Sequence, residues 1–216
     1  MSIAEKLKED TKQIWDKITS HPFMVELCEG NLARDKFKFF ILQDYHYLVS
    51  AIRNFSIIAS KAEKIKDIIE VIQIGYIASA SEYKSYLKLL NSLGLSIEDA
   101  QNTKPSSIVL SYTNFLFSIS RKKSFTESLV SILPCFWSYG DAVKCNNEKL
   151  CSNTDEIYLK WTEVYLSKKY FQLMVRLQNL IDRVSVNFNY NKLKKIFIKS
   201  SRYEYMYWDG MYSFKK

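Results

Sequence analysis

The sequence predicts an all-α protein, because turn residues are scarce and apolar residues follow a helical period. Only five glycines and three prolines occur among the 216 residues, so the connecting loops must be few and short. Apolar residues recur every three or four positions over long stretches, which is the spacing of one helix face. With 47% hydrophobic residues, a chain of this length can bury one large core, and we expect residues 1–216 to form a single domain.

The first two expected helices occupy the first quarter of the chain. Ser2 stands three residues before Glu5, the spacing of a capping box, and apolar residues then recur at helical intervals until Pro22 is expected to end the helix. After a turn at Gly30, a long second helix is predicted from one apolar stripe with a single acidic member. The stripe comprises Phe37, Phe40, Ile41, Asp44, Tyr47, Leu48, Ala51 and Phe55.

A third long helix is predicted from Ile65 to Leu90, with Gly94 in the left-handed position after its end. Its apolar stripe is expected to face the core. The members of the stripe are Ile65, Ile68, Ile69, Ile72, Tyr76, Ala80, Tyr83, Tyr86, Leu87 and Leu90.

Five further helices are expected over residues 109–116, 125–143, 157–165, 170–184 and 193–211. Pro134 lies inside the second of these. Because proline lacks an amide hydrogen and pushes away the carbonyl of Val130, this helix should kink or start afresh there. The polar stretch 144–155 has no periodicity and is predicted to be the one long loop, with Thr154 or Asp155 capping the next helix.

The charge distribution and the composition indicate which kinds of molecule this protein can bind. The net charge is +8, but basic residues are spread singly and in pairs with acidic residues interleaved, which favours a solvated surface over a nucleic-acid site. No apolar stretch has the pattern of a signal peptide or approaches the ~20 residues of a membrane span. We therefore expect a cytoplasmic protein with no nucleic-acid or membrane partner.

Cysteines and histidines give no sign of a metal centre. The four cysteines form no C-x-x-C pair, and neither histidine has the Glu-x-x-His spacing of di-iron bundles. Cys145 and Cys151 are expected to be free thiols, with a disulfide between them as the alternative.

Three reactive side chains break the helical pattern. Asp44 and Glu204 fall on apolar faces, where an unpaired carboxylate costs several kcal/mol or has its pKa shifted upward. Cys135 directly follows Pro134, where nearby amides and a base could lower the thiol pKa enough to give a nucleophilic thiolate. The structural alternatives are that Cys135 is plain packing, that Asp44 pairs with Arg53 or a tyrosine, and that Glu204 pairs with a lysine.

Five segments taken together resemble the TenA/thiaminase II family, in its order and spacing over nearly the whole chain. They are His21-Pro22-Phe23, the stretch 39–48, Pro105-Ser106, the stretch 133–139 and the stretch 201–208. The resemblance implies a haem-oxygenase-like helical bundle, usually a homotetramer, that uses no metal or organic cofactor. It implies a thiamin salvage hydrolase that converts 4-amino-5-aminomethyl-2-methylpyrimidine to the 5-hydroxymethyl pyrimidine and releases ammonia, with poorer cleavage of thiamin itself.

The resemblance, to the cysteine-containing branch of the family, also implies residue roles. Cys135 would add to the pyrimidine ring, Glu204 would act as general acid and base toward the ring nitrogen and the amine, and Asp44 would hold the exocyclic amine near the thiol. We expect these three side chains to surround one pocket. The tyrosines that match the aromatic substrate pocket are Tyr47, Tyr112, Tyr139, Tyr165 and Tyr207, of which Tyr207 stands where a phenylalanine is expected.

Two alternatives to this function remain open on the sequence. One is a non-catalytic protein of the same fold that binds the hydroxymethyl pyrimidine or a related heterocycle. The other is a basic helical module for nucleic acid, whose retention on nucleic acid would depend strongly on salt.

Overall fold

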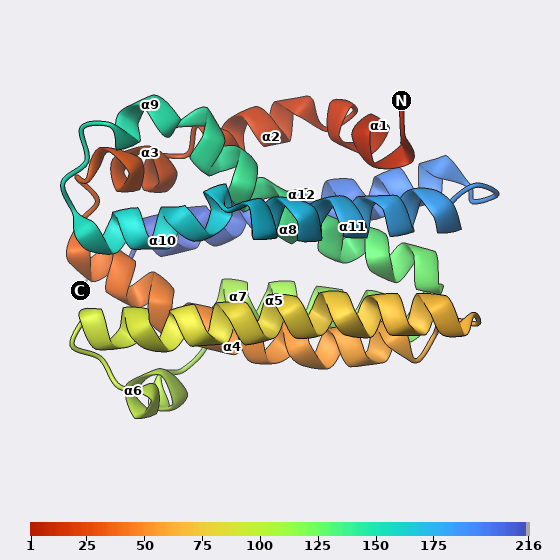
Figure 1. Cartoon of the computed structure of the whole chain (residues 1–216), viewed down its shortest axis with the longest axis horizontal. Helices are drawn as coiled ribbons and strands as arrows, with labels where there is room; N and C mark the ends of the chain where they lie inside the picture. Colours follow the sequence, from red (N-terminus) through yellow and green to blue (C-terminus); the bar gives the residue numbers. More distant parts are fainter. Residues whose placement is uncertain (215–216) are drawn as a thin grey trace.

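The computed structural model describes residues 1–214 apart from the side chain of residue 81, and every regular element in that range is an α-helix (Figure 1). The helices are α1 (Ile3–Glu9), α2 (Lys12–Thr19), α3 (Pro22–Glu29), α4 (Arg34–Ala59), α5 (Ile65–Ser92), α6 (Ile97–Asn102), α7 (Ser107–Lys122), α8 (Phe125–Cys145), α9 (Asn147–Leu150), α10 (Glu156–Leu166), α11 (Lys168–Val184) and α12 (Tyr190–Tyr212). The expected all-α class is confirmed.

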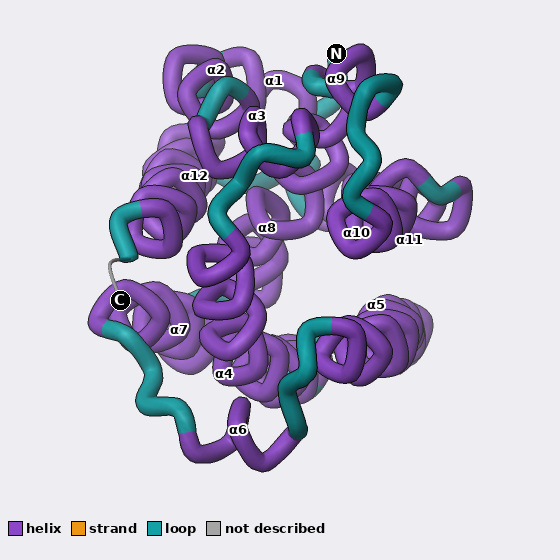
Figure 2. Tube along the Cα trace, turned by 90° about the vertical axis from the view of Figure 1, so that its left-hand side faces the viewer, coloured by secondary structure: helices purple, strands orange, loops and turns teal. Residues whose placement is uncertain are grey.

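The helices stack in layers around α8. In Figure 2, α4, α5 and α7 form the lower layer, α10, α11 and α12 lie above them, and α1, α2 and α3 cover the top. Helix α8 runs through the centre and is buried along most of its length. Aromatic rings join the layers, since Trp208 of α12 packs against Phe23 of α3 at 5.0 Å and Phe40 of α4 at 5.5 Å between ring centroids.

Several helix ends follow the expected local chemistry. Ser2 and Glu5 form a complete capping box at the start of α1. Gly30 has a φ of 81°, a left-handed conformation that glycine adopts without steric cost, and it ends α3. The carboxylate of Asp155 accepts hydrogen bonds from the amides of Ile157 and Tyr158 and so caps α10.

The first expected helix is wrong in two respects. It is divided into α1 and α2 at Asp10 and Thr11, because the Thr11 hydroxyl donates to the carbonyl oxygens of Leu7 and Lys8 and competes with the helical hydrogen bonds. Pro22 lies beyond the end of α2, but it also opens α3 at the first helical position, where a missing amide hydrogen costs nothing.

The connections contain short helices that the sequence pattern did not predict. Helix α6 occupies the link between α5 and α7, and α9 occupies part of the predicted loop 144–155. At Pro134 the expected fresh start is wrong, since α8 continues through the proline as one helix.

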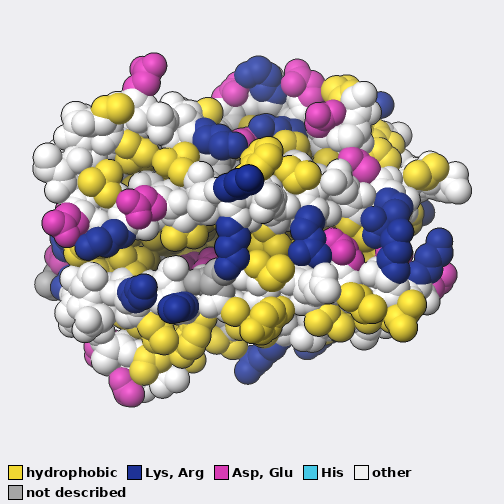
Figure 3. All heavy atoms as spheres, in the orientation of Figure 1, with side chains coloured by type: hydrophobic (Ala, Val, Ile, Leu, Met, Phe, Trp, Pro, Cys, Tyr) yellow, Lys and Arg dark blue, Asp and Glu magenta, His cyan; other side chains and the backbone are white. Residues whose placement is uncertain are grey.

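The predicted buried face of α5 is wrong for most of its residues, although Tyr86 and Leu90 are buried as expected. Most of the apolar stripe is exposed, and Figure 3 shows it as a band of hydrophobic atoms along α5. The exposed members are Ile65 (75%), Ile69 (48%), Ile72 (55%), Tyr76 (71%), Tyr83 (44%) and Leu87 (39%). The core-facing side carries smaller residues such as Gly75, where an added Cβ would lie 2.9 Å from the Phe55 ring. Among the described residues, no helix is long and apolar enough to cross a membrane.

Candidate active site

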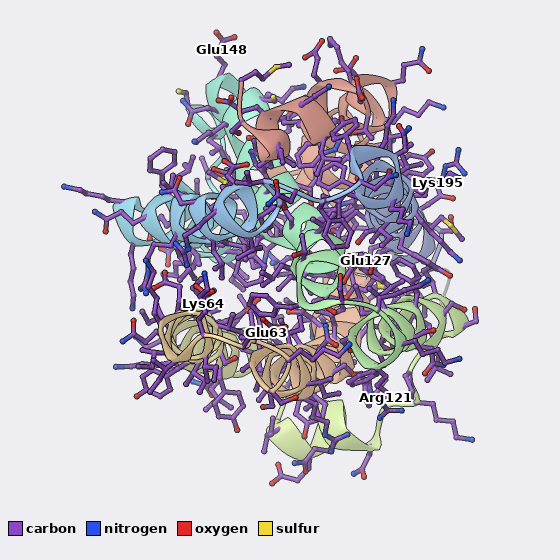
Figure 4. The ribbon with its side chains drawn as sticks, turned by 90° about the vertical axis from the view of Figure 1, so that its right-hand side faces the viewer. Glu63, Lys64, Arg121, Glu127, Glu148 and Lys195 are labelled. Carbon is purple, nitrogen blue, oxygen red and sulfur yellow. The ribbon has the colours of Figure 1, made fainter. Side chains whose placement is uncertain are left out.

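A cavity lies among α4, α5, α8, α10 and α11. Figure 4 views the bundle from the end where α4 turns into α5, a turn marked by Glu63 and Lys64, and shows α5 across from α11. Asp44 of α4 and Cys135 of α8 both line the cavity, as expected. The other lining residues are Tyr47, Ile77, Ala78, Glu82, Phe136, Tyr139, Val164, Tyr165, Ser167, Lys169, Tyr170 and Leu173.

Glu204 of α12 lies behind the cavity wall and is 1% exposed. Its carboxylate accepts a hydrogen bond from the Tyr112 hydroxyl and another, 3.2 Å long, from the Ser138 hydroxyl. Burial raises the pKa of Glu204 to about 7, although both hydrogen bonds act in the opposite direction by favouring the charged form. No lysine pairs with Glu204 among the ion pairs of residues 1–214, and hydroxyl groups take that place.

Cys135 lies in the middle of α8 and is partly exposed to the cavity. Burial raises the pKa of its thiol well above the ordinary value, and the negative charge of Glu204 raises it further. A hydrogen bond with the Tyr47 side chain favours the thiolate, but its effect is smaller. The expected lowering of the thiol pKa is therefore wrong, because the thiol is buried and the charged group that acts on it most strongly, Glu204, is an acid and not a cation.

Asp44 is 9% exposed, and its pKa is raised by burial and by the charges of Glu82 and Glu204. Arg53, a partner considered for it, is exposed on the outer side of α4. Glu82 of α5 is a third carboxylate at this site, and burial raises its pKa to about 7. Glu82 was not predicted as a site residue, because the other face of α5 was expected to face the core.

The five expected tyrosines divide into two groups. Tyr47, Tyr139 and Tyr165 line the cavity, and the rings of Tyr139 and Tyr165 lie 5.1 Å apart between centroids. Tyr112 and Tyr207 are buried behind the wall, where Tyr112 bonds Glu204. The buried hydroxyl of Tyr207 has no hydrogen-bond partner among the side chains and backbone that the structure describes.

Three more residues complete the surroundings of the cavity without having been predicted. Ser138 holds Glu204, as described above, and the Tyr170 hydroxyl donates to the carbonyl oxygen of Phe136 at 2.8 Å. Spacing alone gave a signal for Ser138, which follows Cys135 by three residues and therefore lies near it on α8. Tyr170 and Phe136 looked like ordinary amphipathic core residues in the sequence.

The described histidine, cysteine, aspartate and glutamate side chains contain no group of three or more placed to hold a metal ion. All four cysteines are free thiols, with Cys145 and Cys151 exposed and Cys28 buried. The expectation of free thiols at Cys145 and Cys151 is confirmed.

The chain is similar to known proteins over nearly its whole length. Residues 8–213 match the TENA/THI-4/PQQC family. The chain is 32% identical to an aminopyrimidine aminohydrolase of Helicobacter pylori over 221 residues, covering 98% of this chain and 99% of the relative. A solved TenA homologue from P. horikoshii OT3 is 39% identical, covers 98% of this chain and 99% of its own, and superposes with a TM-score of 0.93.

A more distant structure supports the fold. A domain of unknown function with a heme oxygenase-like fold from Shewanella denitrificans OS217 covers 96% of this chain and 90% of its own, with a TM-score of 0.78 at 16% identity. The helical bundle is thus of the haem-oxygenase-like kind. The match over residues 8–213 shows that the chain belongs to the TENA/THI-4/PQQC family.

Proposed function

We propose that this chain is an aminopyrimidine aminohydrolase, a single-domain hydrolase that converts 4-amino-5-aminomethyl-2-methylpyrimidine to the 5-hydroxymethyl pyrimidine with release of ammonia. The observation that carries the proposal is the arrangement of Cys135 and Asp44 around one tyrosine-walled cavity, with Glu204 held directly behind it. The full-length similarity to a relative of that name supports the substrate class.

The reaction begins with covalent addition. Sγ of Cys135 adds to a carbon of the pyrimidine ring, its proton passes to the Glu204 carboxylate, and Glu204 protonates a ring nitrogen. A carboxyl whose pKa is about 7 can both accept and donate a proton near neutral pH. This transfer also removes the obstacle of the high thiol pKa, because the proton leaves Cys135 while the new bond forms.

The second half of the reaction replaces nitrogen by oxygen. Once the ring has lost its aromaticity, the C–N bond of the exocyclic methylene breaks. The amine leaves from its protonated ammonium form, so the nitrogen takes the electron pair of this bond and departs as ammonia. Water then adds to the methylene carbon and loses a proton. The thiolate finally departs and takes up the proton that the ring nitrogen gives back through Glu204, which restores the aromatic ring and the enzyme.

Binding of the flat ring rests on the aromatic wall. Tyr139 and Tyr165 both line the cavity. Stacking of the pyrimidine on one of these rings would contribute about 0.5–1.5 kcal/mol beyond the buried area. Asp44 accepts a hydrogen bond from an exocyclic amine and so holds the ring near the thiol. This fixes the ring carbon within reach of Cys135, and correct positioning is a large part of the rate enhancement of such reactions.

The test of the proposal is incubation of the purified protein with the aminomethyl pyrimidine, with ammonia and the hydroxymethyl product measured together. We expect both to appear in equal amounts, and thiamin to be cleaved more slowly. Binding of the hydroxymethyl compound without any ammonia release from the aminomethyl compound would contradict the proposal, because it would describe a non-catalytic binding protein.

We further propose a cytoplasmic homotetramer. The exposed apolar face of α5 supports association, since contiguous apolar patches on a protein surface commonly mark interfaces. Two exposed free thiols, Cys145 and Cys151, suit a reducing compartment. Sedimentation should show a tetramer, and Ile72→Glu on the α5 face should shift it to smaller species, whereas Lys195→Glu on α12 should not. A wild-type monomer at micromolar concentration would contradict the tetramer.

A further inference from the structure

The active-site cavity opens into a larger groove between α5 and α10. The groove and the cavity share several lining residues, including both Asp44 and Glu82. Farther along, the groove is lined by residues of α5 and α10 such as Lys88 and Glu163. Glu82 therefore lies at the junction between the place where the ring is bound and the space that leads away from it, and the mechanism above gives it no role.

The carboxylates at this junction have no partner of opposite charge within the described part of the chain. Asp44 is more than nine-tenths buried, lines both spaces, and takes part in no hydrogen bond or ion pair there. The Glu82 carboxylate also takes part in no hydrogen bond or ion pair within the described residues, and its pKa is raised by burial alone. Because Glu82 also raises the pKa of Asp44, the two carboxylates repel each other, and a bound cation would relieve the repulsion.

Lysine side chains lie nearby, but among the described residues none is bonded to Asp44 or Glu82. Lys169 is the one basic residue among the described residues that line the cavity. The groove is also lined by Lys84, Lys88 and Lys160, of which Lys160 is paired with Glu156 at 3.1 Å. An incoming cation therefore meets two carboxyl groups that no lysine already occupies.

The proposed substrate carries such a cation. A primary amine on a methylene group is protonated at neutral pH, as the lysine side chain is. Protonation also suits the chemistry, because an ammonium leaves as neutral ammonia when the C–N electron pair moves to nitrogen, and the positive charge passes to the ring.

We propose that Glu82 forms a binding subsite for the positively charged leaving group, at the junction of the cavity and the groove, and holds the aminomethyl nitrogen as an ammonium while the ring lies against Cys135. This subsite rests on the proposed function, since that function supplies the aminomethyl pyrimidine. Glu82 selects substrates with a cationic leaving group, and the groove beyond it takes the released amine.

The test compares two ligands that differ in charge at one atom. Dissociation constants are measured by calorimetry for the aminomethyl and the hydroxymethyl pyrimidine, in a Cys135→Ser background that prevents turnover. A hydrogen bond to a charged group contributes about 1.5–3 kcal/mol, so adding Glu82→Gln should weaken binding of the aminomethyl compound roughly 10- to 100-fold. Binding of the neutral hydroxymethyl compound should change less than about threefold. Glu163→Gln, which removes a groove carboxylate outside the cavity, is the matched control and should affect neither ligand.

The outcomes separate this subsite from the proposed function. If the parent variant binds both compounds and Glu82→Gln weakens both equally or neither, the subsite is wrong and the proposed function stands. If the parent binds neither compound and the wild type releases no ammonia, both are wrong. Glu82→Asp keeps the negative charge, so it should retain most of the preference for the aminomethyl compound. If Glu82→Gln does not fold, the two dissociation constants are measured for Glu82→Asp instead.

Discussion

Replacing the buried Glu204 carboxylate by an amide should remove a pH-dependent loss of stability. Burial raises the pKa of Glu204 from 4.5 to about 7, so the folded protein binds this proton more tightly than the unfolded chain does. The stability that the group contributes is therefore fully present below about pH 4.5 and is lost as the pH rises through about 7. At about 1.4 kcal/mol per pKa unit, the loss amounts to about 3 kcal/mol.

Glu204→Gln mimics the protonated carboxyl and cannot ionise. We expect the free energy of unfolding of the variant, relative to wild type, to increase by about 3 kcal/mol between roughly pH 4 and pH 8.5. The assay is denaturant unfolding across this pH range. All samples have the same protein concentration, so that any association between chains affects them equally. Glu156→Gln, whose side chain is 82% exposed on α10, controls for the loss of one carboxylate.

The same variant should lose activity while it gains stability. Removal of a general acid–base group typically costs roughly 10²- to 10⁴-fold in rate. A constant difference in unfolding free energy between variant and wild type at all pH values would refute the reasoning, because it would mean that burial does not shift this carboxyl group.

Two further predictions concern the tyrosines behind the cavity wall. Tyr112→Phe removes a hydrogen bond that favours the charged form of Glu204, so the acidic limb of kcat/KM against pH should move upward by about one to two pH units. An unmoved limb would argue against Glu204 as the base. Tyr207→Phe removes a buried hydroxyl without a described partner, so thermal unfolding should show an equal or higher Tm with turnover retained. A large loss of turnover would show instead that this hydroxyl serves the substrate.

Helical periodicity predicted the fold class and the position of every long helix, because amphipathic helices have to place their apolar residues at fixed intervals. It could not predict which partner covers an apolar face. On α5 several large residues, such as Ile72 and Tyr76, face outward, whereas the inner face combines buried Ile74 with the small Gly75, which lies against Phe55 of α4. A stripe of large apolar residues is equally compatible with a core and with an interface.

Helical periodicity also predicted part of the candidate site, because it shows which reactive side chains fall on apolar faces. Asp44, Cys135 and Glu204 stood out because each is a reactive group on an apolar face, and the structure brings the first two to one cavity with the third behind it. Glu82 lies four residues after Ala78 on the inner face of α5. It was not predicted, because the other face of α5 was expected to be buried. The direction of the Cys135 pKa shift depends on burial and on the carboxylates that tertiary packing gathers around the thiol, which no local pattern contains.

The most direct test of the central claim is the Cys135→Ser variant, assayed both for ammonia release from the aminomethyl pyrimidine and for binding of the hydroxymethyl product. A hydroxyl is close to a thiol in size but is a much weaker nucleophile at neutral pH, so turnover should be almost abolished while binding stays nearly intact. Cys28→Ser, Cys145→Ser and Cys151→Ser should behave like wild type in turnover. Wild-type turnover in Cys135→Ser would contradict the account, and loss of turnover on changing one of the other three cysteines would place the nucleophile elsewhere.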